Sequence, residues 1–237
     1  MVENKAIVAR KRKEKRDPRT IFAPLIVLVI IIAALEICLR VFDVPSYVLP
    51  LPSNMLKATI KSFHVILPDM LFSIKTILIG YIVAVPVGIL LAAVFSQFEL
   101  IVKAVRPVII CLTITPMITL IPLMTLWMGT APTLRVIIVI IQAVPIICLN
   151  TLNGFTTVEK EKLELARSVG ATKLQTFLYV VFMNAMPQVF TGLKLGCIFS
   201  TIGAVSADFV SRNIGLGDRI IKFLKYSNFE QSYGCII

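Results

Sequence analysis

The sequence has 237 residues, of which 57% are hydrophobic, and its formal net charge is +11. Soluble domains contain about 45–50% apolar residues, so this composition, with a mean hydropathy of +0.91, excludes an ordinary soluble domain. The apolar runs are long enough for membrane helices of about 20 residues and do not alternate as barrel strands do, so we expect an all-α, polytopic membrane protein.

The N-terminal 20 residues form a strongly basic tail. Eight lysines and arginines precede the first apolar run, and positive charge beside a membrane helix retains that side in the cytosol and attracts anionic lipid. No base-reading module follows, so a nucleic-acid partner is not expected. The run 21–39 is too long for a signal peptide and lacks a small-residue cleavage site. Residues 1–20 are therefore predicted to be a cytosolic tail before an uncleaved span.

Residues 21–237 are predicted to form one transmembrane domain. The predicted spans are 21–40, 70–95, 107–128, 134–152 and 188–210. A short helix outside the membrane core is expected over 53–69, ending near Pro68. Within the second span, Gly80 and Gly88 share a side and should let a neighbouring helix approach closely.

The distribution of lysine and arginine predicts the orientation. With the N-terminus in the cytosol, the cytosolic segments 1–20, 96–107 and 153–187 contain 14 of these residues, and the outer segments contain eight. An excess of positive charge in cytosolic segments is the general rule. The last long polar segment, 153–187, is therefore placed in the cytosol.

The segment 153–187 is longer than a connector needs and should have its own structure. Its stretch "VEKEKLELARS" (158–168) consists of good helix formers. Gly170 is predicted to end this helix in the left-handed conformation, and Thr172 to cap the next. Two short helices at an angle follow, with apolar and charged residues at the bend. The residues alone allow docking into a groove of another protein or contact with lipid headgroups.

The stretch "ELARSVGATKLQTFLYVVFMNAMPQVFTGLKLG" (164–196) resembles the EAA signature of permease subunits of bacterial ABC importers. Glu164, Ala166 and Gly170 match this signature, and Leu165 replaces its first alanine.

The rest of the resemblance extends over about residues 44–237. Phe182-Met183 stands where the family has a Leu-Pro pair, and a later proline of a related pattern is present as Pro187. Four further stretches resemble the nitrate/sulfonate/taurine subgroup: "ITLIPLMTLWMG" (118–129), "LNTLNGF" (149–155), "FTGLKLG" (190–196) and "NIGLGDRI" (213–220).

The resemblance implies a permease subunit that is coupled to a separate ATPase. The residues implied in this coupling are Glu164, Ala166, Arg167, Gly170, Ala171 and Pro187. No GxxxxGK[ST] motif occurs in the sequence, so ATP would be bound by the partner, and we expect neither a cofactor nor enzymatic activity in this chain.

The family also implies partners, a location and a further span. The expected partners are the ATPase subunit, an extracytoplasmic substrate-binding protein and a second, identical permease, in the inner membrane. Such permeases have a sixth span where this sequence ends, so five of six spans are expected, with the sixth truncated. The five cysteines are scattered and His64 is the single histidine, so no metal site or disulfide framework is predicted.

The candidates for the solute pathway are Thr115, Thr119, Gln142 and Asp208. Threonines in membrane helices usually bond their own backbone, whereas Gln142 can equally bond a neighbouring helix or line a pathway. A charge such as Asp208 is costly in a span and usually functional, although pairing with Arg212 is an alternative.

Two other functions stay open at this point. A secondary transporter or channel would work without an ATPase and would need ionisable residues near mid-membrane. A scaffold protein would use the threonines only for packing. The sequence does not identify the solute, for which nitrate, sulfonates, taurine and vitamin precursors are all compatible with the resemblance.

Overall fold

The computed structural model describes residues 18–211 and 214–236, and the described residues form helices and connecting turns, without a strand. The predicted tail 1–20 thus lies almost entirely outside the described residues. The chain divides into two compact units, Met1–Ser62 with Tyr226–Ile237 and Phe63–Lys225. Each unit is described by itself.

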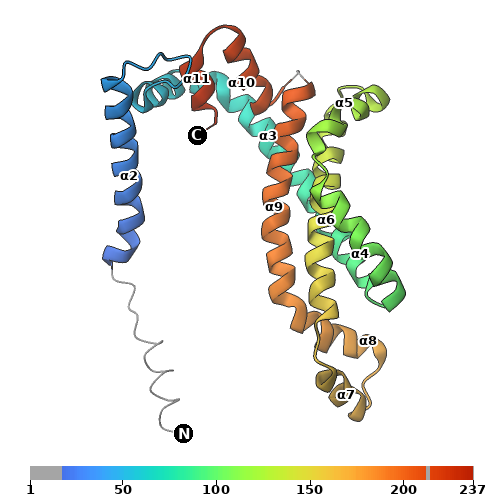
Figure 1. The fold of residues 1–237 in the computed structure, drawn as a ribbon. Helices are drawn as coiled ribbons and strands as arrows, with labels where there is room; N and C mark the ends of the chain where they lie inside the picture. The colour runs from blue at the N-terminus through green and yellow to red at the C-terminus, as the bar shows by residue number, and fades with distance from the viewer. Residues whose placement is uncertain (1–17, 212–213, 237) are drawn as a thin grey trace. The chain divides into compact units, whose positions relative to one another are not determined.

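The larger unit, Phe63–Lys225, contains most of the helices (Figure 1). Its elements are the main part of α3 (Pro52–Phe95), α4 (Glu99–Ile114), α5 (Met117–Met128), α6 (Pro132–Thr156), α7 (Lys160–Ser168), α8 (Lys173–Gln175), the π-helix η1 (Thr176–Phe182), α9 (Met183–Ser211) and α10 (Leu216–Lys225).

The smaller unit contains α2 (Pro18–Val41), the first turns of α3 and α11 (Phe229–Gly234). An exposed ion pair joins Arg40 to Glu36 on α2, with a distance of 2.6 Å. The Tyr233 hydroxyl donates a hydrogen bond to the Val48 carbonyl (2.9 Å). This bond attaches α11 to the loop that precedes α3.

Four helical segments are long and apolar enough to cross a membrane: Ala23–Val41, Pro52–Phe95, Pro132–Thr156 and Lys173–Val210. The bent pair α4 and α5 would make a fifth crossing if it counts as one span. The predicted fold class, an all-α polytopic membrane protein, is confirmed by these helices.

The second span begins much earlier than the sequence predicts. A separate short helix over 53–69 and a span over 70–95 were expected, but α3 runs through both without a break and has 44 residues. Pro68 and Pro86 lie inside it. Proline removes one backbone hydrogen bond and can bend a helix, but membrane helices tolerate it because neighbouring helices and hydroxyl side chains can satisfy the freed backbone group.

The third predicted span, 107–128, is wrong as a single helix. α4 begins earlier, at Glu99, and is followed by α5 after a bend of 89°. The bend falls at Thr115 and Pro116, whose ψ angles of 122° and 106° are extended. A residue before proline avoids the helical region because of the proline ring, and this restriction explains the break.

Helix α6 lies at the centre of the larger unit and runs beside α9 (Figure 1). The predicted close approach at Gly80 and Gly88 is confirmed, because these glycines of α3 face Val139 and Ile147 of α6. From α9, Gly196 faces the same Ile147. Small residues let helix backbones approach closely in a membrane, and here they pack α3 and α9 onto α6.

Replacing Gly88 with leucine should destabilise this packing. A Cβ atom at position 88 would lie 2.8 Å from Ile147 Cγ2 and 2.9 Å from Ile147 Cβ, and overpacking of this kind costs about 1–3 kcal/mol. We expect a lower melting temperature and a smaller monodisperse fraction in detergent. Leu90→Phe is the control, since Leu90 is 63% exposed. An unchanged melting temperature for Gly88→Leu would contradict the packing described here.

Candidate functional site

The bend between α7 and α8 (residues 160–175, the α7–α8 bend) has a defined backbone structure. Gly170 has φ +75°. Its N–H donates to the Arg167 carbonyl, and the Ala171 N–H donates to the Ala166 carbonyl, both at 3.0 Å. This pair of bonds is a Schellman motif, which satisfies the free carbonyls at a helix end. The predicted helix end at Gly170 is confirmed.

The next helix starts two residues after Gly170. The Gln175 N–H donates to Thr172 Oγ1 (3.3 Å), and the Thr172 N–H donates to Gln175 Oε1 (2.8 Å). These reciprocal bonds form a capping box, and the predicted cap at Thr172 is confirmed. Because both helix ends are bonded, the bend has one specific geometry.

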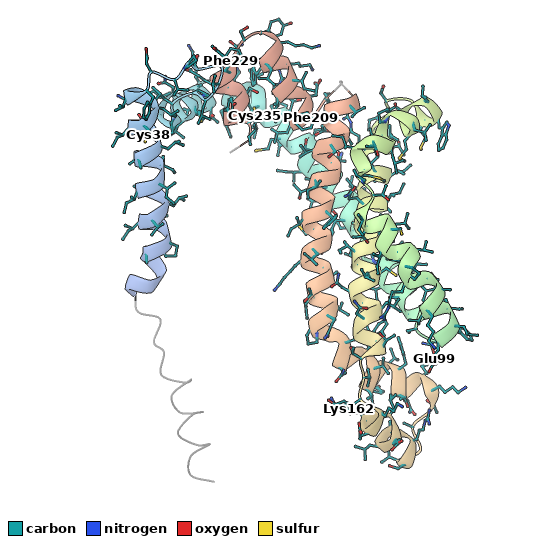
Figure 2. The ribbon with its side chains drawn as sticks, in the orientation of Figure 1. Cys38, Glu99, Lys162, Phe209, Phe229 and Cys235 are labelled. Atoms are coloured by element: carbon teal, nitrogen blue, oxygen red, sulfur yellow. The ribbon has the colours of Figure 1, made fainter. Side chains whose placement is uncertain are left out.

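Side chains attach the α7–α8 bend to the long helices. Lys162 Nζ donates to Asn184 Oδ1 of α9 at 2.9 Å. Phe155, at the end of α6, contacts Phe177 and Phe182 of η1, with ring centroids 5.2 Å and 6.1 Å apart. Figure 2 shows Lys162 and Glu99 at one end of the larger unit and Phe209 at the other.

The α7–α8 bend exposes large apolar side chains. Leu165 and Val169 are 67% and 76% exposed, and Tyr179 of η1 is 72% exposed. These residues line a mostly apolar groove of about 660 Å³. Exposed apolar groups gathered at one place, with charged residues around them, are typical of an interaction surface.

The residues predicted to contact an ATPase lie in two places. Glu164, Arg167 and Gly170 are exposed on the α7–α8 bend, whereas Ala166 is buried and Ala171 is half-buried. Pro187 lies inside α9 rather than on the bend, and is exposed there.

The part of the polar segment 153–187 that is separate from the long helices is shorter than predicted. α6 continues to Thr156, and the helix that begins at Lys173 continues without interruption to Val210. The first turns after the bend are a π-helix, Thr176–Phe182. Polar residues can continue a membrane helix beyond the apolar region. The polar composition of this segment therefore does not show where the two long helices end.

The two threonine candidates bond to their own backbone. Thr115 Oγ1 donates to the Cys111 carbonyl at 2.8 Å, and Thr119 Oγ1 donates to the Pro116 carbonyl at 2.7 Å. This is the common role of threonine in membrane helices. Gln142 is half-buried on α6, and its Oε1 atom is buried without a hydrogen-bond partner among the described residues.

Asp208 is fully buried near the end of α9. Its Oδ2 atom accepts a hydrogen bond from Ser73 Oγ of α3 at 2.6 Å, and its Oδ1 atom lies 3.6 Å from Nε of Arg135. Arg135, from the first turn of α6, is 2% exposed and stacks over the Phe72 ring at 4.9 Å. Arg212, the alternative partner, lies outside the described residues.

Residues around Asp208 also hold the start of α10. Asp69 of α3 accepts hydrogen bonds from the Gly215 N–H (3.3 Å) and from Arg219 Nε (2.5 Å). Ser73 Oγ accepts a hydrogen bond from the Leu216 N–H at 2.9 Å. We call this group the buried charge junction, and it consists of Asp69, Ser73, Arg135, Asp208, Asp218 and Arg219.

Sequence reasoning identified one member of the buried charge junction, Asp208, and missed the others. Asp69 and Arg135 lie in segments that were assigned to outer loops, where charges are ordinary. A signal was present nonetheless, because Asp69 and Ser73 are one helical turn apart and share one face of a helix. Their partners, 135–150 positions away in the sequence, could not be identified from the local sequence pattern.

Comparison with known proteins gives the family. The family model described as "Binding-protein-dependent transport system inner membrane component" matches residues 84–237. The "Formylaminopyrimidine transport permease protein ThiX" of Halalkalibacterium halodurans is 29% identical over 183 residues, which cover 77% of this chain and 73% of that protein.

Two further relatives match shorter parts. The "Riboflavin transport system permease protein RibX" of Chloroflexus aurantiacus is 31% identical over 115 residues, covering 48% of this chain and 43% of that protein. The "Taurine transport system permease protein TauC" of Escherichia coli is 26% identical, covering 56% and 47%. The chain thus spans less than half the length of these two relatives in the alignments.

A solved structure shares the fold. The crystal structure of an amino acid ABC transporter with histidines matches with a TM-score of 0.61 and 16% identity, over 74% of this chain and 85% of that chain. Since the family model covers well over half of the sequence, the chain belongs to the family of binding-protein-dependent transport system inner membrane components.

Proposed function

We propose that the chain is the transmembrane permease subunit of an ATP-binding-cassette importer. In this function it forms the membrane pathway for a small solute and is driven by ATP hydrolysis in a separate ATPase subunit. The observation that carries the proposal is the α7–α8 bend, where Leu165 and Val169 are exposed on a backbone with bonded helix ends. Family membership supports the same assignment.

The ATPase is proposed to bind the α7–α8 bend. The exposed apolar side chains would be buried in a cleft of the partner, and Glu164 and Arg167 would contribute charged contacts around them. Gly170, through its positive φ, and half-buried Ala171 would fix the direction in which the bend meets the partner. Pro187, inside α9, would act by bending the helix behind the bend.

The remaining partners are proposed on the basis of family membership. We propose an extracytoplasmic substrate-binding protein and a second, identical permease copy in the inner membrane, with the N-terminus in the cytosol. The solute is proposed to belong to the nitrate, sulfonate, taurine or vitamin-precursor class, because relatives are named for nitrate, taurine and riboflavin transport. No cofactor of the chain's own takes part, and ATP is bound by the partner.

The function is tested by reconstituting the permease with its ATPase and binding protein in liposomes. We expect uptake of the solute only when ATP is present on the side of the membrane where the ATPase is bound. Uptake by the permease alone would instead favour the secondary transporter, and an absence of any transport would favour the scaffold.

Leu165→Asp should prevent binding of the ATPase. A carboxylate in the centre of an apolar contact would be desolvated without a partner, so we expect the ATPase to be lost when the permease is purified from membranes. Leu224→Asp on α10 is the matched control, because Leu224 is also an exposed leucine but lies outside the bend. Equal recovery of the ATPase with both variants would refute the docking surface.

Gly170→Pro should uncouple ATP hydrolysis from uptake. Proline fixes φ near −65° and has no N–H, whereas Gly170 has φ +75° and donates to Arg167. Gly170→Asn is the control, since asparagine tolerates the left-handed conformation and retains the N–H. We expect membrane insertion of both variants, and normal uptake only for Gly170→Asn. Uptake at the wild-type level by Gly170→Pro would contradict the mechanism.

Among the pathway candidates, Gln142 is proposed to contact the solute, because its Oε1 atom has no bond within the described residues. Gln142→Leu should raise the KM for uptake, measured with the isotopically labelled solute in reconstituted vesicles. Thr115→Val and Thr119→Val should leave the KM unchanged, since both hydroxyls already bond their own backbone. A changed KM in the threonine variants alone would reverse this assignment.

A further inference from the structure

We propose that the buried charge junction is the positioning element that transmits movement of α9 to α3 and α10, with Asp208 as its central residue. This inference rests on the proposed function, because it assigns a role within the ATP-driven transport cycle. It changes the role expected for Asp208 from contacting the solute to holding three helices together.

The first observation is that α10 begins on side chains from other helices. The consecutive N–H groups of Gly215 and Leu216 donate to Asp69 and Ser73 of α3, respectively, and Ser73 in turn donates to Asp208 of α9. The first N–H groups of a helix have no partner within the helix. Here α3 supplies both acceptors, and Asp208 of α9 holds one of them and packs against Gly215, so the position of α10 depends on both helices.

The second observation is the charge at the end of α9. A carboxylate in the last turn of a helix is unfavourable beside the negative end of the helix dipole, and a fully buried charge needs a partner. Arg135 of α6, 3.6 Å away, supplies that charge. Three carboxylates (Asp69, Asp208 and Asp218) are balanced by three cations (Arg135, Arg219 and Lys222).

The third observation is the close contact between the Gly215 backbone and the Asp208 carboxylate. It has φ +125°, which L residues rarely adopt, and a Cβ atom there would overlap the Asp208 carboxylate. Backbone and carboxylate are therefore packed directly together. A displacement of Asp208 must move the start of α10 as well.

The fourth observation is the path from the α7–α8 bend to the buried charge junction. From Lys173 the helix continues without interruption to Val210, and α9 alone has 29 residues, which corresponds to about 43 Å at 1.5 Å per residue. The N-terminal end of this continuous helix lies at the proposed ATPase contact. The other end carries Asp208. A displacement of α9 that starts at the α7–α8 bend would therefore reach α3 and α10 through the buried charge junction.

Asp208→Asn tests the proposal in the complete importer, reconstituted with ATPase and binding protein. The variant retains the size of the side chain but removes the charge that faces Arg135. We expect ATP hydrolysis stimulated by the binding protein to persist, while the ratio of ATP hydrolysed to solute taken up rises about tenfold, within the range usual for coupling between sites. A parallel loss of both activities, or no change in the ratio, would overturn the proposal.

A matched control separates positioning from stability. Ile138→Ala removes a fully buried side chain on α6, one turn from Arg135, and should lower the melting temperature while the coupling ratio stays at the wild-type value. A raised ratio in Ile138→Ala would show that any destabilisation uncouples the importer, and the proposal would fail.

Ser73→Ala keeps the test decisive if Asp208→Asn does not fold, and a double variant tests the pairing of Asp208 with Arg135. Ser73→Ala removes both the bond to Asp208 and the acceptor for Leu216, and should also raise the coupling ratio. The double variant Asp208→Asn with Arg135→Gln should be no worse than Asp208→Asn alone, because it removes both members of the ion pair together. Additive effects would contradict the pairing.

The result for the wild-type complex distinguishes this inference from the proposed function. If the wild-type importer shows no ATP-dependent uptake, the proposed function itself is wrong. If it transports normally and the junction variants retain the wild-type coupling ratio, only the role of the buried charge junction is wrong.

Discussion

The larger unit depends on one constraint, which is that every backbone N–H and C=O group needs a partner where water is scarce. Long helices meet this constraint along their length, so the difficulty is confined to the places where the chain reverses. At one end a Schellman motif and a capping box close the backbone around Gly170. At the other end, side chains of α3 accept hydrogen bonds from the first N–H groups of α10. The two ends therefore use opposite solutions, one local in sequence and one long-range.

This difference explains which features the sequence could predict. The bend at Gly170 and the cap at Thr172 depend on residues within a few positions, and both were predicted correctly. The glycines that face α6 were also predictable, because their spacing places them on one side of α3. The sharpness of the break at Thr115 could not be predicted from the sequence, since prolines at 68 and 86 remain inside a helix, and only the context decides which proline ends one.

The buried charge junction was beyond local reasoning for a different reason. Asp69 and Arg135 each follow or precede an apolar run, where a charge ordinarily faces water or lipid headgroups. Their burial results from the packing of four helices, which brings together positions far apart in the chain. A buried carboxylate with a hydroxyl and a guanidinium beside it marks a place where geometry is maintained at a cost in desolvation. Such a cost suits a group whose internal geometry must be retained while the helices that it joins move together.

The π-helix over Thr176–Phe182 connects the α7–α8 bend to α9. Its i to i+5 bonding accommodates one more residue than an α-helix would in the same length, and Phe177 and Phe182, five positions apart, both reach Phe155. Deleting one residue here would restore regular α-helical winding with little rotation of the segment on its N-terminal side, whereas the same deletion in a regular α-helix would rotate that segment by about 100° around the axis. The π-turn can therefore take a change in length of one residue while the exposed leucine and valine keep their direction.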